Sequence, residues 1–186
     1  MKQLLCSIAL LTVALTMAQG QSLRVGYYGE TVTHYGLKVA YEHPLWQHTR
    51  PRNQATKQFL LAPGLAAYRH PHNHIGFILS PELTYRRIGR RGGLFDLSVA
   101  PAYFRYFLDG TTYRVNPSGD FERVRLAGGS AFMPTVSVGV GCDLSVRRQI
   151  PLTWYTRLNL MQQRPYNTSQ LSRFSLEAGL VIPISR

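Results

Sequence analysis

Three histidines alternate with other residues in one short segment, His70-Pro71-His72-Asn73-His74. In an extended chain, residues two apart share a face, so the three imidazoles could converge on Zn²⁺ or Cu²⁺. No carboxylate or thiolate stands close by in the sequence, and this spacing matches no established metal site. We therefore interpret His70, His72 and His74 as a polar surface turn, with a metal site as the alternative.

Charged residues recur at alternate positions within otherwise apolar segments. Across 74–86, apolar side chains occupy most odd positions, whereas Glu82 and Arg86 stand at even positions. Three later segments alternate in the same way: 134–145, 152–160 and 174–185. This period of two is typical of a strand with two different faces, and helical periodicity is weak throughout the chain.

The alternating segments are long. A globular strand averages about 5–6 residues, whereas a tilted strand needs about 9–11 to cross a bilayer. We expect strands at about 22–29, 34–46, 57–69, 74–88, 93–107, 131–146, 151–162 and 172–186. Together they predict an all-β fold, an eight-stranded antiparallel up-and-down transmembrane β-barrel with polar side chains inside. A soluble barrel of lipocalin type, apolar inside, is the alternative.

The first twenty residues are interpreted as a cleaved secretory signal peptide. Lys2 gives a basic start, residues 4–17 are uncharged and mostly apolar, and small residues follow at 18 and 20. The apolar run is too short for a spanning helix. Residues 21–186 then form one barrel domain with a long external loop at about 108–130, in which Thr112–Val115 and Glu122–Arg125 could pair as a hairpin. Cys142 would be the one remaining cysteine, which excludes an internal disulfide.

The chain of 186 residues carries a formal net charge of +12 although only 16% of its residues are charged. That low share, against about 25% in ordinary domains, excludes a disordered, highly charged chain. The expected periplasmic turns are basic and are assigned to lipid head groups: Arg90, Arg91, Arg147 and Arg148. No nucleic-acid-binding motif accompanies the charge, so we expect no nucleic-acid partner.

The signal, the alternation and a Gly/aromatic strand texture, as in Tyr35-Gly-Leu-Lys-Val-Ala-Tyr-Glu42, resemble the small outer-membrane β-barrel proteins of Gram-negative bacteria. The resemblance covers roughly 22–186. It implies an outer-membrane location, contact with outer-membrane lipids, and the barrel-assembly machinery and periplasmic chaperones as partners during biogenesis. The sequence departs from the pattern at its end, because Ile184-Ser185-Arg186 lacks the terminal aromatic residue common in such barrels.

The inward faces of the expected strands carry nine charged residues: Arg24, Lys38, Glu42, Glu82, Arg86, Asp96, Asp143, Arg157 and Glu177. An eight-stranded barrel is just wide enough to be filled by side chains, so these charges must be paired. We expect two tiers that close the lumen to ions. Glu42, Arg86, Asp96 and Asp143 form the tier nearer the periplasm, and Lys38, Glu82, Arg157 and Glu177 form the upper tier. Arg157 is the central cation of the whole network.

These patterns favour a structural or binding role in the outer membrane, with the external ligand unidentified. We assign no catalytic residue and no cofactor. The first alternative is an enzyme that modifies lipids, an acyl hydrolase or acyltransferase on lipopolysaccharide or phospholipid, although the sequence has no His-x-Ser pair like those of phospholipase and lipid A deacylase barrels. The second is a narrow pore. Four prolines inside expected strands are read as bulges or as sites of sideways lipid entry: Pro63, Pro81, Pro101 and Pro134.

Overall fold

The structure is a computed structural model that describes residues 20–30, 34–51, 54–166 and 169–184. The expected signal peptide, apart from Gly20, lies outside the described residues. None of the helices in the described ranges is long and apolar enough to cross a membrane.

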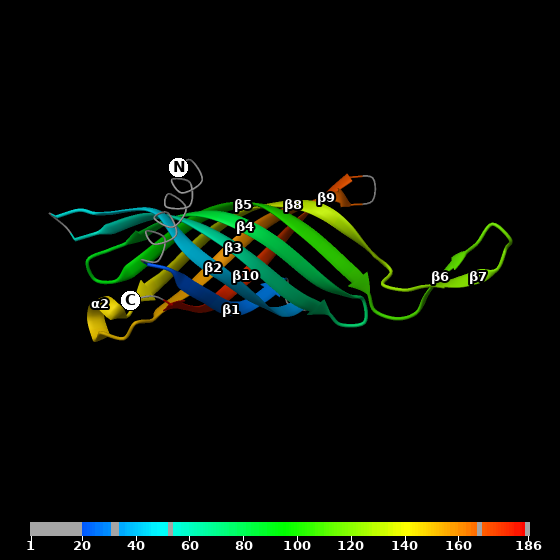
Figure 1. The fold of residues 1–186 in the computed structure, drawn as a ribbon, viewed down its shortest axis with the longest axis horizontal. Coiled ribbons are helices and arrows are strands. Elements are labelled where there is room, and N and C mark those ends of the chain that lie inside the picture. The colour runs from blue at the N-terminus through cyan, green and yellow to red at the C-terminus, as the bar shows by residue number, and fades with distance from the viewer. Residues whose placement is uncertain (1–19, 31–33, 52–53, 167–168, 185–186) are drawn as a thin grey trace, which may run out of the picture.

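Eight of the strands formed by the described residues close into one antiparallel ring (Figure 1). In chain order they are β1 Ser22–Glu30, β2 His34–Thr49, β3 Thr56–His70, β4 His74–Ile88, β5 Gly93–Leu108, β8 Gly128–Asp143, β9 Thr153–Tyr166 and β10 Ser169–Pro183. Each strand pairs with its neighbours along this series, and β1 pairs with β10 to close the barrel. The all-β, eight-stranded antiparallel up-and-down fold predicted from the alternation is confirmed.

Side chains alternate between the outside and the inside along the middle of the wall strands. On β4, Leu79 is 54% exposed whereas its neighbour Ser80 is 4% exposed. The same contrast holds along the other strands, where the exposed positions are largely Val, Leu, Ile and aromatic residues. The barrel is therefore apolar outside and polar inside, which excludes the lipocalin-type arrangement.

The strand ends differ from expectation at two connections. β8 begins earlier than expected, at Gly128, because Gly128 and Gly129 pair with Phe107 and Tyr106 of β5. At its other end, residues 144–146 leave the ladder, and the helical turn α2 (Ser145–Arg148) leads toward β9. Between β2 and β3, the ladder continues into the expected connection 47–56, as far as the pair Thr49–Thr56, and this hairpin reaches beyond the rim at the α2 end of the barrel (Figure 1).

The four strand prolines lie side by side rather than at bulges. Pro63 faces Pro81 across β3 and β4, and Pro101 faces Pro134 across β5 and β8. The constant register of β4 and β5 also sets Pro81 opposite Pro101, where the ladder is interrupted between Leu79–Tyr103 and Leu83–Val99. Since proline has no N–H to donate, these are gaps in the hydrogen bonding without an inserted residue. The bulge interpretation was wrong at these sites, and the register shifts fall near Pro44 and near Ser169 instead.

The connection from β5 to β8 carries a second, two-stranded sheet. β6 (Thr112–Val115) pairs with β7 (Phe121–Val124), one residue earlier than the expected Glu122–Arg125. Asn116 closes the turn, because its side-chain oxygen accepts from the backbone N–H groups of Ser118 and Asp120. The hairpin projects away from the barrel at the end opposite α2, which we call the mouth (Figure 1).

Deleting residues 112–125 should leave the barrel folded, since no ladder joins β6 or β7 to the eight wall strands. Heat-modifiable migration on a denaturing gel after membrane extraction measures this. Deleting residues 94–107 of β5, which are equal in number, is the control and should abolish the folded band. Loss of membrane insertion on the first deletion would contradict the assignment of this segment as a separate external loop.

Candidate functional site

Four cations and four carboxylates are buried together in the lumen. They come from six strands of the described chain: Arg24 on β1, Lys38 and Glu42 on β2, Glu82 and Arg86 on β4, Asp96 on β5, Arg157 on β9 and Glu177 on β10. We call these eight residues the lumen network. Their formal charges sum to zero although the chain as a whole is strongly basic.

Arg86 organises the part of the lumen network nearest α2. Its guanidinium donates to both carboxylate oxygens of Glu42, at 2.7 and 2.8 Å. The same group donates from Nε and Nη2 to Asp96, at 2.9 and 3.0 Å. This two-sided pairing uses the planar donor geometry that distinguishes arginine from lysine.

Lys38 and Glu177 form the part nearer the mouth. The Lys38 ammonium lies 2.5 Å from Glu82 Oε1 and 2.9 Å from Glu177 Oε2. The Tyr155 hydroxyl donates to the other oxygen of Glu177 at 3.0 Å. The flexible lysine stem thus places one positive charge between carboxylates of two strands on opposite sides of the closed ring.

Two further arginines join these parts into one connected network. Arg157 donates to Glu82 at 2.9 Å and to Asp96 at 2.7 Å. Arg24 donates to Glu82 at 2.5 Å, and its guanidinium also lies within 3.4 Å of Glu42. The expectation of two separate tiers was therefore wrong, because Arg24 and Arg157 connect them into one network of alternating positive and negative charges.

Gly139 of β8 gives Arg157 its position. The two residues are paired across β8 and β9, and a Cβ at Gly139 would stand 2.5 Å from Cγ of Arg157. Tyr155 supports the same guanidinium, which lies 5.8 Å from the centre of its ring. The Arg157 stem thus occupies the space that a side chain on β8 would fill.

Asp143 does not join the lumen network. It is the last residue of β8 and is partly exposed, and its carboxylate accepts from the backbone N–H of Ser145 at 2.9 Å. Its own N–H donates to the carbonyl of Gly92, where the β4–β5 turn meets this strand. The inward placement expected from alternation was wrong because the chain turns away from the lumen at this residue.

A second buried pair, Glu30 and Arg173, lies nearer the mouth and was missed by sequence reasoning. Arg173 donates to Glu30, to Gln163 at 2.8 Å and to the Tyr68 hydroxyl at 2.6 Å. Its guanidinium also lies 4.9 Å from the centre of the Phe104 ring. Extending the alternation by two residues along each strand would have identified both. Glu30 lies on the same inward face as Arg24, and Arg173 lies on the same inward face as Glu177.

Above this pair the barrel opens into a mouth cavity of about 730 Å³. Its wall includes Glu30, His34, His70, His74, Tyr106 and Arg173. The rings of His34 and His70 are 3.9 Å apart, and those of His70 and His74 are 5.3 Å apart. His72 lies apart from them, exposed in the turn with a positive φ of 62°. Within the described ranges, no three His, Cys, Asp or Glu side chains are arranged to hold a metal ion.

The basic turns lie at the end opposite the mouth. Arg90 and Arg91 are exposed in the β4–β5 turn, and Arg148 is exposed at the end of α2. The backbone of Arg147 belongs to the same helical turn. The structure thus gathers this group at one rim, well separated from the lumen network.

No family model matches the sequence, and no curated protein matches it. The fold is similar to the crystal structure of Neisserial surface protein A, with a TM-score of 0.53 and 10% sequence identity. The alignment covers 88% of this chain and 95% of that chain. This likeness supports the barrel fold over nearly the full length of both proteins.

Replacing Arg157 with Leu should destabilise the barrel by about 3–5 kcal/mol, because Glu82 and Asp96 would lose a buried partner. Urea unfolding in detergent or lipid vesicles measures the change. Arg123→Leu in the exposed hairpin is the matched control and should leave the unfolding midpoint unchanged. An unchanged midpoint for Arg157→Leu would mean that the lumen network does not contribute to stability.

Proposed function

We propose that the protein is an outer-membrane barrel with a structural or binding role, whose lumen is closed to ions by the lumen network. The observation that carries the proposal is the sidedness of the wall. Apolar side chains cover its outside, whereas the eight charged residues of the lumen network and Glu30 are buried within it. In water this arrangement would leave the apolar outer surface exposed, whereas a bilayer covers that surface and leaves the polar side chains in the lumen, paired with one another.

Aromatic side chains near both ends of the wall support a membrane location. Toward α2, the Trp46 and Phe59 rings are 5.9 Å apart and the Phe59 and Tyr85 rings are 5.4 Å apart. Toward the mouth, Phe77 and Phe107 pack at 6.0 Å. Aromatic girdles of this kind lie at the two interfaces of membrane barrels. The basic turns beyond the first girdle suit anionic lipid head groups.

Closure of the lumen follows from its charge balance and burial. Every carboxylate of the lumen network lies within 3 Å of a cation, and the side chains of Arg157 and Glu177 have no exposed surface. An ion crossing this layer would have to separate pairs that hold each other in a medium of low dielectric constant. We therefore favour a sealed barrel over the narrow pore.

The binding role is assigned to the mouth cavity and to the hairpin β6–β7. One face of the hairpin presents Tyr113, Val115 and Phe121 around Arg123, and Phe121 is 76% exposed. A lone two-stranded hairpin is marginally stable in water, and loops on a rigid scaffold commonly carry recognition. Export by the segment 1–20, followed by insertion with the mouth facing outward, would place this surface outside the cell.

Trypsin added to intact cells should cut after Arg114, Arg123 or Arg125 in the hairpin and leave the turn at Arg90 and Arg91 intact. Mass spectrometry of the released peptides identifies the cut sites. Permeabilising the outer membrane first is the control, because it should expose the second turn as well. Cutting only at Arg90 and Arg91 in intact cells would show that the barrel has the opposite orientation.

The purified protein should give no current steps in a planar lipid bilayer and release no fatty acid from phospholipid or lipopolysaccharide. Replacing Arg157 and Asp96 together by Ala removes one cation and one anion, and should introduce small current steps by opening the network without changing its net charge. The control is Glu122→Ala with Arg123→Ala in the hairpin, which should stay silent.

Steady current from the unmodified protein would favour the pore, and release or transfer of acyl chains would favour the lipid-modifying enzyme. Silence of the unmodified protein in both assays, with current from the lumen variant, is the result expected of a sealed barrel.

A further inference from the structure

The cross-strand row that contains the four prolines continues on β9 and β10, where polar residues occupy it. The constant register of β8 and β9 sets Pro134 opposite Gln162, and Gln162 is paired with Ser172 of β10. The β8–β9 ladder is interrupted here, between the pairs Phe132–Arg164 and Thr135–Met161. Because Pro134 has no N–H to donate, the wall lacks part of its cross-strand bonding at this point.

A notch of about 460 Å³ lies at this interruption. Its outward-facing lining is mostly apolar and includes Pro101, Phe132, Pro134, Val136 and Leu160. Three residues of the inward face, Ala100, Thr135 and Met161, also line it, so the notch reaches into the wall rather than lying on its surface. Its size and apolar lining suit a hydrocarbon chain.

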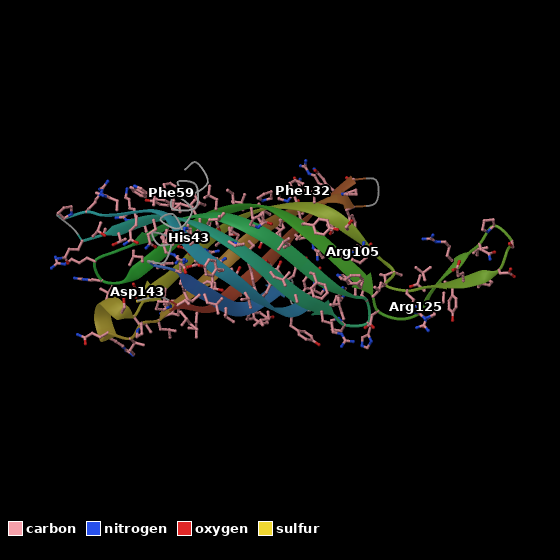
Figure 2. All side chains as sticks on the ribbon, viewed as in Figure 1. His43, Phe59, Arg105, Arg125, Phe132 and Asp143 are labelled. Atoms are coloured by element: carbon pink, nitrogen blue, oxygen red, sulfur yellow. The ribbon has the colours of Figure 1, made fainter. Side chains whose placement is uncertain are left out.

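The end of the notch toward the mouth is polar. Arg164 lies two residues beyond Gln162 along β9 and donates to its side-chain oxygen. Ser172 lines both the notch and the mouth cavity, so the two hollows share a wall. Arg105 of β5 lies near the same end of the wall, two residues beyond Tyr103, the partner of Phe132 (Figure 2). The lining of the notch thus runs from apolar residues to the hydrogen-bonding side chains of Gln162 and Ser172, and Arg164 stands next to Gln162 at that end.

The outer wall carries no negative charge to oppose an anion there. All nine acidic residues of the chain lie elsewhere. Four belong to the lumen network and Glu30 to the mouth, whereas the rest lie in the external loop or at the end of β8: Asp109, Asp120, Glu122 and Asp143. A guanidinium at the end of an apolar notch, with no carboxylate on the same wall, complements a phosphate group attached to an acyl chain.

We propose that this notch binds one phosphate-bearing lipid, with an acyl chain against Pro134, Val136 and Leu160 and its phosphate on Arg164. The proposal rests on the membrane location proposed above, and it adds a specific lipid site to that location. Binding requires no chemistry on the lipid. Lipids in ordinary contact with the outer wall are held whether or not they carry a phosphate. A preference for the phosphate-bearing lipid therefore distinguishes a specific site from that ordinary contact.

Native mass spectrometry of the full protein in an uncharged detergent tests the site. Phosphatidylglycerol and a diacylglycerol with the same chains are added separately as probes. The unmodified protein should retain one phosphatidylglycerol in preference to diacylglycerol. Arg164→Gln should weaken phosphatidylglycerol binding roughly tenfold, as expected for loss of a hydrogen-bonded charge, and leave diacylglycerol binding unchanged. Arg125→Gln in the external loop is the control for loss of a positive charge and should change neither.

Val136→Trp should fill the notch and weaken binding of both probes. Val138→Trp is its control, because Val138 lies on the same strand and face with a matching exposure, 47% against 48%, but does not line the notch. Leu160→Trp fills the notch from β9. It is used instead of Val136→Trp if heat-modifiable migration shows Val136→Trp to be unfolded.

Equal lipid retention by the notch-filling variant and its control would overturn the site, and so would an undiminished preference of Arg164→Gln for phosphatidylglycerol. Neither result depends on whether the lumen conducts, so the site and the sealed barrel can fail separately.

Discussion

Closure of the backbone ladder is the constraint from which the rest of this structure follows. Within a bilayer a backbone N–H or C=O has no water to bond, so each wall strand must be paired on both sides. The pairing of β1 with β10 provides this by leaving no edge. A closed ladder fixes the alternation of side chains, and alternation obliges every second residue to fill a narrow lumen. The lumen network is how this chain fills the half of its lumen nearest α2.

The lumen is layered along the barrel. Beyond the charged layer lies an apolar one that includes Ile78, Met133 and Met161, and beyond it come Glu30, Arg173 and the mouth cavity. Small residues of β3 and β5 in this region, including Ala66 and Ala102, leave room for the Tyr68 and Phe104 rings to stack at 6.2 Å. The apolar layer separates the Glu30–Arg173 pair from the lumen network, so the two polar groups form their ion pairs independently.

The alternation in the sequence was enough to predict the strands, their sidedness and the inward position of all eight residues of the lumen network. It failed where a strand leaves the ladder, as at Asp143, because periodicity carries no information once the backbone turns. It also left out Glu30, which lies one residue beyond the expected strand 22–29. Arg173 was left out as well, although it lies inside the expected strand 172–186 on the same face as Glu177. The individual contacts could not be predicted either. Arg24 and Glu82 meet from 58 residues apart, and that pairing depends on the stagger of the closed strands.

The shared carboxylates of the lumen network restrict how the sequence of this barrel can drift. Glu82 serves Arg24, Lys38 and Arg157 at once, so a single replacement there affects three cations and is tolerated only with compensating changes. On the lipid-facing wall away from the notch and the aromatic pairs, by contrast, apolar side chains project outward without ion-pair partners, so one can replace another with less consequence. The outside can thus diverge one residue at a time while the inside must change in groups. Two barrels can therefore share a fold at 10% identity and still differ entirely in how their lumens are filled.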